Sequence, residues 1–229
     1  MESAARPTVT VYGEAELEVE PDHADLHLTV QIQGRERGSV VRLLAEELRA
    51  ARSLLDPYGA AVERVADGAL WINPERSDSR RGAEKITGYG GGAELEVTVV
   101  EFERLGDIVV ALAGLEHGTV AGPTWRLRRD HPVHEQARTQ AVQAAVLRAR
   151  QYASALGSEL TGLVSLADQG LGEGESYVAS GNRGPVHAAV SYGSLGSFKK
   201  SPELDLRPVE QTVRATVVAR FTLRPPELS

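Results

Sequence analysis

"KITGYGGGAELEVTVV", from Lys85 to Val100, places three consecutive glycines directly before an alternating apolar pattern. A phosphate-binding loop needs its glycines to be followed by a helix, whose free N–H groups and dipole then point at the anion. Here the glycines instead enter a strand, because every second residue is apolar: Ala93, Leu95, Val97 and Val99. Glycine inside a strand marks a bend, a bulge or a close backbone approach. We therefore predict a structural role for Gly90 to Gly92 and no nucleotide site.

Strand patterns recur along the rest of the chain. Apolar and polar residues alternate over residues 9–19, 24–33 and 209–223, and the short break at Pro21-Asp22 predicts that the first two strands form a hairpin. Shorter strand-like runs cover residues 62–73, 119–129 and 159–168. Most of these strands have one polar face, which predicts a largely antiparallel sheet with helices packed on the other face.

Three segments have helical periodicity. The first carries an apolar stripe of Val41, Leu44, Leu48, Ala51 and Leu55, and the second runs from Leu105 to a stop at Gly114. The third begins near Pro132, and its stripe consists of Val142, Ala145, Val146, Ala149, Tyr152, Ala153 and Leu156. The element order predicts an α+β fold, and the recurrence of strand-helix-strand units indicates two similar βαβ-type halves.

Composition excludes several classes of protein. The 229 residues carry a net charge of −7, which disfavours a nucleic-acid binder, and they contain no cysteine for a disulfide, a thiolate nucleophile or a Cys-based zinc site. No apolar run approaches the ~20 residues of a membrane span, and the N-terminal residues contain no signal-like apolar segment. We expect a cytoplasmic protein. Residues 170–206 hold seven glycines and many serines, and this composition predicts a long exposed insertion.

The best metal candidate is the sequence HADLH. His23, Asp25 and His27 share one strand face through the two-residue period, and Glu16, Glu18 and Glu20 would lie across the predicted hairpin. Two imidazoles and a carboxylate are suitable ligands for zinc or another divalent ion, although structural and catalytic sites use three or four. The alternative is a solvated polar face, because the intervening residues are all apolar.

Other chemical signals are weaker. His131, His134 and Glu135 do not have the spacing of a zinc protease, and Asp130 with Glu135 is better explained by capping of the following helix. The basic group formed by Arg126, Arg128 and Arg129 is typical of a solvated face that makes ion pairs, and phosphate or acidic-partner binding is the alternative. Trp71 and Trp125 are expected to be core or interface anchors. No nucleophile motif precedes a helix, so we identify neither catalytic residues nor a cofactor site.

Four stretches together resemble the SIMPL domain family, also called DUF541. They are VTVYGEAELEVEPDHADLHLTV near the start, ITGYGGGAELEVTV in the middle, ARTQAVQAAVLRARQYASALGSEL in the long helix, and EQTVRATVVARFTL at the end. The resemblance runs from about Val9 to Leu223 and implies a SIMPL-like domain over residues 8–224, with an α+β fold and a tendency to self-assemble into large rings or channel-like oligomers. Bacterial members are often exported to the cell envelope and linked to stress tolerance, and a mammalian relative is an adaptor in kinase signalling. The family offers no established catalytic residue to carry over.

The chain departs from the family in two places. The family usually continues its I-T-G-Y with polar residues, often Arg-Ala-Ser-Asn, where this chain has Gly90 to Ala93; a site formed by those side chains would be lost here. Exported members also carry a signal peptide that these residues lack. Three functions follow as hypotheses: a non-enzymatic homo-oligomeric scaffold, which we prefer; a metal- or small-molecule-binding protein that uses His23, Asp25 and His27; and a peptide-binding adaptor that uses residues 170–206.

Overall fold

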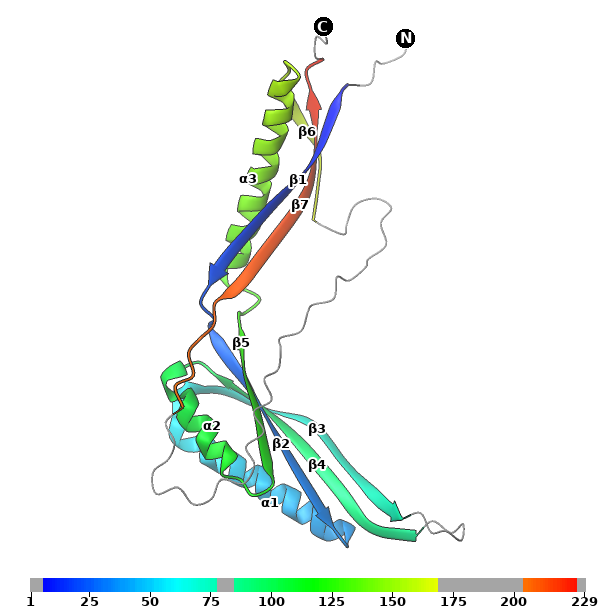
Figure 1. The fold of residues 1–229 in the computed structure, drawn as a ribbon, viewed down its shortest axis with the longest axis vertical. Coiled ribbons are helices and arrows are strands. Elements are labelled where there is room, and N and C mark those ends of the chain that lie inside the picture. Colours follow the sequence, from blue (N-terminus) through cyan, green and yellow to red (C-terminus); the bar gives the residue numbers. More distant parts are fainter. Residues whose placement is uncertain (1–5, 78–84, 169–203, 226–229) are drawn as a thin grey trace. The chain divides into compact units, whose positions relative to one another are not determined.

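A computed structural model describes residues 6–77, 85–168 and 204–225 of the chain (Figure 1). They form three α-helices and seven strands, and the strands make two separate antiparallel sheets. The predicted α+β class is confirmed, but we expected one sheet. The chain divides into two compact units. Among the described residues, the terminal unit comprises residues 6–20, 128–168 and 210–225, and the central unit comprises residues 21–77, 85–127 and 204–209. All but residues 204–206 of the predicted insertion lie outside the described residues, so the exposure of that segment stays a prediction.

The terminal unit is a three-stranded sheet with one long helix on it. Its strands are β1 (Thr8–Val19), β7 (Gln211–Leu223) and β6 (Leu160–Asp168), in the order β1-β7-β6. The helix α3 (Pro132–Ala155) packs across β1 and β7 (Figure 1). All twelve residues of β1 pair with β7, which brings the two ends of the chain into one sheet.

The buried face of α3 is a stripe of alanines at a spacing of four: Ala137, Ala141, Ala145, Ala149 and Ala153. Our predicted stripe also included Tyr152 and Leu156, which are exposed. The small methyl groups let the helix backbone approach the sheet closely. At Gly13 of β1, an added Cβ would lie 2.6 Å from the backbone nitrogen of Ala145. Size, rather than hydrophobicity, therefore decides which side of this helix is buried.

The central unit is a four-stranded sheet with two helices on one face. The strands β2 (His23–Gly34), β3 (Val62–Ser77), β4 (Lys85–Val99) and β5 (Gly118–Arg126) pair in the order β3-β4-β2-β5. The helices are α1 (Arg37–Leu55) and α2 (Leu105–Ala113), and two short 3₁₀ turns, η1 (Asp56–Ala61) and η2 (Phe102–Arg104), connect them to the sheet.

The core of the central unit lies between the sheet and these helices. Its largest fully buried side chains include Leu26, Leu28, Leu95, Leu105 and Ile108. The stripe of α1 differs from our prediction at one position, because Val40 is buried and Val41 is exposed. Figure 1 shows both helices on the same side of this sheet.

The predicted hairpin between the first two strands is wrong. β1 pairs with β7 in one sheet, and β2 lies between β4 and β5 in the other. The break at Pro21-Asp22 is the point where the chain passes from one unit to the other. Glu16 therefore faces Arg214 of β7, with an ion pair of 3.0 Å, rather than the residues of β2. Alternation is compatible with any antiparallel partner, so it could not reveal this pairing.

Candidate functional site

The glycine run lies inside β4, as predicted, and its pairing with β2 continues through it without a register shift. Gly91 faces the helices, where an added Cβ would lie 2.7 Å from Val40 Cγ1 and 2.8 Å from Leu44 Cδ1. No helix follows the glycines, so their N–H groups do not form a helix-terminus anion site. The missing side chain at Gly91 lets residues of α1 pack directly against the backbone of β4.

Trp71 packs on the other side of the same run. It is the cross-strand partner of Gly92, where an added Cβ would lie 2.7 Å from the indole Nε1 and Cε2 atoms. Its side chain is 41% exposed, so Trp71 is a surface residue rather than a core anchor. Trp125, in contrast, contacts Phe102 edge to face at a centroid distance of 4.9 Å and packs against the core.

The predicted metal ligands lie on the face of β2 that points away from the helices. Asp25 is 6% exposed and already partnered: Arg126 Nε lies 2.7 Å from its Oδ2, and Thr98 Oγ1 donates to its Oδ1 at 3.0 Å. His23 Nδ1 contacts the carboxylate of the preceding Asp22. Both carboxylate oxygens of Asp25 are thus occupied by protein donors, which fits a structural ion pair.

The three predicted ligands do not gather other ligating groups around them. In the part of the chain that the structure describes, no group of three or more His, Cys, Asp or Glu residues is placed to hold a metal ion. The glutamates expected across a hairpin belong to the other unit. The metal hypothesis stays a prediction, and a zinc-induced rise in melting temperature that His23→Ala abolishes would support it.

The start of α3 uses His131 as its cap. His131 Nδ1 accepts a hydrogen bond from the backbone N–H of Val133 at 3.2 Å, and Pro132 occupies the first helical position. Capping is therefore confirmed as the explanation of this segment, but the capping residue is His131 rather than Asp130. Arg126 makes the ion pair with Asp25, which is the role that we expected for a member of the basic group.

One surface was missed from the sequence. β6 is an edge strand, and two bulges in its pairing with β7 place Leu160, Leu163 and Leu166 opposite residues of β7 that face α3. α3 does not cover the last two, because Leu163 is 58% and Leu166 is 47% exposed. A leucine at every third position is not a strand period, so the alternation rule could not find this face. Gly162 was the one local sign of a bulge.

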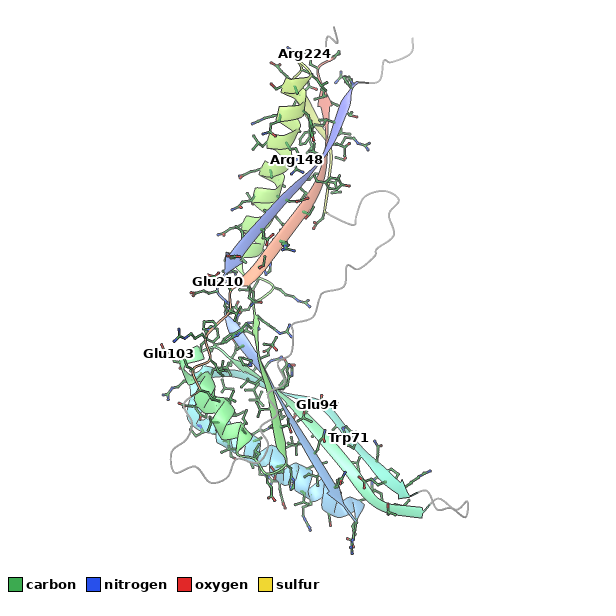
Figure 2. The ribbon with its side chains drawn as sticks, in the orientation of Figure 1. Trp71, Glu94, Glu103, Arg148, Glu210 and Arg224 are labelled. Atoms are coloured by element: carbon green, nitrogen blue, oxygen red, sulfur yellow. The ribbon has the colours of Figure 1, made fainter. Side chains whose placement is uncertain are left out.

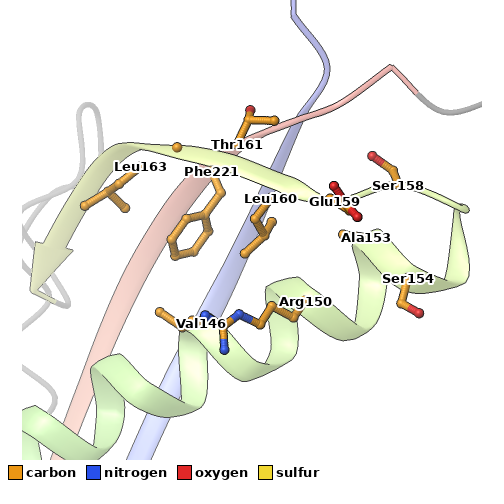
Figure 3. Close-up of a pocket in the computed structure, with 11 residues that line it drawn as sticks. Val146, Arg150, Ala153, Ser154, Ser158, Glu159, Leu160, Thr161, Leu163 and Phe221 are labelled. Carbon is orange, nitrogen blue, oxygen red and sulfur yellow. The ribbon is translucent and has the colours of Figure 1, made fainter.

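A groove separates β6 from α3. It has a volume of about 740 Å³, and its apolar lining comes from Val146 on α3, from Leu160 and Leu163 on β6, and from Phe221 on β7 (Figure 3). Arg150 and Glu159 stand at its polar side, and Glu159 is paired with Arg224 at 3.3 Å. We give the name β6 surface to the apolar residues of the groove's two sides together with the exposed apolar residues of β6: Leu160, Leu163, Val164, Leu166 and Val146.

Comparisons with known proteins bear on the whole chain. No helix among the described residues is long and apolar enough to cross a membrane. No curated protein matches the chain. A family model named SIMPL, described as a protein of unknown function (DUF541), matches residues 9–221. The match runs through strands and helices of both units, from β1 to β7. The chain therefore belongs to the SIMPL family.

Proposed function

We propose that this protein is a non-enzymatic assembly protein whose copies associate through the β6 surface. The observation that supports this function is that β6 is an edge strand among the described residues and has large, exposed apolar side chains. Leu163, Val164 and Leu166 are 58%, 51% and 47% exposed. An edge strand presents free N–H and C=O groups, and a long apolar one pairs readily with another chain.

The other three edge strands differ from β6 in their residues. In β1, every second residue from Glu14 to Glu18 is an exposed glutamate. Arg148 of α3, labelled in Figure 2, donates a hydrogen bond to the carbonyl of Tyr12 in this strand at 2.8 Å. β3 contains five charged residues and Pro74. β5 contains Pro123, which has no N–H to donate. Charged residues and prolines are the features that protect strand edges from pairing.

β6 has no such protection over most of its length. Its sequence LTGLVSLAD has no charged residue before Asp168 and no proline. The bulges interrupt its pairing with β7, but they also turn its leucines toward the groove beside α3. Among the four edges that the structure describes, β6 is the one suited to pair with another strand.

The occupant that fits best is β6 of a second copy. Antiparallel pairing of two identical edges closes around a two-fold axis, so that each copy offers the same surface to the other. The leucines and valine of one strand would then meet those of its partner, and burying such side chains contributes about 1.5–3 kcal/mol each. Dimers formed in this way would be the building block of larger assemblies.

Light scattering after size exclusion tests this function. At about 50 μM, above the micromolar dissociation constants of weak specific complexes, the native chain should be an oligomer. Leu163→Lys with Leu166→Lys should give a monomer, because two charges would be buried on pairing. Val41→Lys is the matched control, since Val41 is a 45% exposed apolar residue of α1. A native monomer would refute the assembly function, and an oligomer that survives the double substitution would refute the role of β6.

A further inference from the structure

The face of the central sheet that points away from the helices contains a track without side chains. Gly88, Gly90 and Gly92 of β4 point to this face, because the residues between them point to the core. The track runs between two rows of polar and aromatic side chains. Its neighbours on β3 are Glu75, Asn73 and Trp71, and its neighbours on β2 are Gln33 and Gln31. A strand with three such positions has room for a large side chain to lie flat on it.

Trp71 fills part of the track. An added Cβ at Gly92 would lie 2.7–2.8 Å from three atoms of the indole, and one at Gly90 would lie 3.7 Å from its Cζ3. One side of the ring therefore rests on the backbone of β4, while 41% of the residue stays exposed. Figure 2 labels Trp71 on β3 and Glu94 on the neighbouring β4. The indole is a supported platform, since the sheet fixes the orientation of its open face.

Two carboxylates flank this ring. Glu75 lies in the same track as the ring. A Cβ added at Gly90 would lie 3.0 Å from Glu75 Oε1 and 3.7 Å from Trp71 Cζ3, so both side chains border the same glycine. Glu94 comes after Gly92 on the same face of β4. It packs against Gly68 of β3, where an added Cβ would lie 2.9 Å from the Cβ of Glu94. Neither side-chain carboxylate has an ion-pair or hydrogen-bond partner within the described ranges; the hydrogen bond that Thr87 donates to Glu75 goes to its backbone carbonyl. Two exposed, uncompensated negative charges thus stand on either side of an open aromatic face.

The chemistry of this surface fits a cation. An aromatic face attracts Lys and Arg through its quadrupole, most strongly for tryptophan, and carboxylates form the strongest hydrogen bonds with guanidinium. The neighbouring Gln31, Gln33 and Asn73 add carbonyl acceptors and no positive charge. The same two carboxylates would repel a phosphate or another anion. The net charge of −7 also favours approach by a basic partner.

We propose that this face, the Trp71 platform, binds a basic peptide segment. One arginine or lysine lies on the open side of Trp71, and cationic residues before and after it pair with Glu75 and Glu94. The row from Gly68 to Glu75 extends over about 20 Å at the rise of a strand, which suits an extended chain with several positive charges better than one small cation. This site lies in the central unit and does not depend on the β6 surface.

Fluorescence anisotropy of a labelled hexa-arginine peptide tests the proposal. We expect saturable binding in dilute buffer that weakens in 0.5 M salt, because exposed ion pairs are screened. Glu75→Gln with Glu94→Gln should weaken binding about fivefold or more, and Trp71→Phe about two- to fivefold, as expected for an exposed cation–π contact. Glu103→Gln is the matched control: Glu103 is an exposed glutamate of η2 in the same unit, away from this face (Figure 2). Circular dichroism confirms that each variant is folded.

A second measurement identifies the residue that is contacted. Trp125→Phe leaves Trp71 as the one tryptophan of the chain, and its emission should change as unlabelled peptide is added. Equal affinities for the Gln double variant and the Glu103 control would overturn the proposal, because binding would then not depend on Glu75 and Glu94. Unchanged Trp71 emission would overturn it as well. So would saturable binding of a neutral oligosaccharide such as chitohexaose at this tryptophan in place of the peptide.

Discussion

Replacing Gly13 by alanine tests the contact between α3 and β1. The added Cβ would lie 2.6 Å from the nitrogen and 2.7 Å from the Cβ of Ala145, and closer still to the carbonyl oxygen of Ala141. Two of these three are backbone atoms of a 24-residue helix, so no side chain can rotate away. Ordinary contact begins at 3.4 Å, and the helix must therefore move from the sheet by about 0.8 Å or more.

The cost follows from the alanine stripe. Five buried methyl groups at ~0.8 kcal/mol each contribute about 4 kcal/mol to the contact between α3 and the sheet. A gap of 0.5–1 Å forfeits a quarter to a half of the dispersion attraction, about 1–2 kcal/mol here. Overpacking strain adds about 1–3 kcal/mol. We therefore expect Gly13→Ala to lower the free energy of unfolding by about 3 kcal/mol.

Urea unfolding with two probes measures this effect. Both tryptophans, Trp71 and Trp125, lie in the central unit, whereas α3 lies in the terminal unit. The midpoint from circular dichroism should fall, and the midpoint from tryptophan fluorescence should change less. Gly38→Ala is the matched control: no atom lies within 4 Å of its added Cβ in α1, and we expect a gain of about 0.4–1 kcal/mol. A Gly13 variant that unfolds within about 0.5 kcal/mol of the native chain would refute the close approach of α3 and β1.

Two further predictions concern the central unit. Asp25→Ala should lower the free energy of unfolding by about 2 kcal/mol, because Thr98 loses its acceptor and Arg126 its buried partner, and Asp25→Asn should cost about half as much; equal stability of all three proteins in thermal melts would contradict the ion-pair role. Burial raises the pKa of Tyr58 above its usual 10.0, and Asp107 adds to the rise. The unfolded chain then releases the tyrosine proton more readily than the folded chain, so stability should fall as the pH rises above 10. Tyr58→Phe should flatten this fall in the urea midpoint, and an identical pH dependence in both proteins would contradict the role of Tyr58.

Local patterns in the sequence determined the elements of this protein and its α+β class. Ala93 to Val99 alternate because one face of β4 is buried, and the same alternation made the glycine run part of a strand rather than a phosphate loop. When one side of an element is buried, apolar residues repeat every two positions in a strand and every 3.6 positions in a helix. These periods can be recognised without knowing which other element covers the buried side. The histidine and aspartate positions on β2 could be assigned to one face for the same reason.

Tertiary structure alone decided which elements meet. Glu16 pairs with Arg214, 198 positions away, although nothing in either strand specifies its partner. The register of β5 brings Arg126 to Asp25, a contact that the sequence of β2 could not reveal. Two bulges aligned Leu163 with Leu166 on an open edge, and the glycine track gave Trp71 a support on the neighbouring strand. Pairing, register and bulges depend on contacts between distant segments, and a periodic pattern satisfies many such arrangements equally well until the whole chain packs.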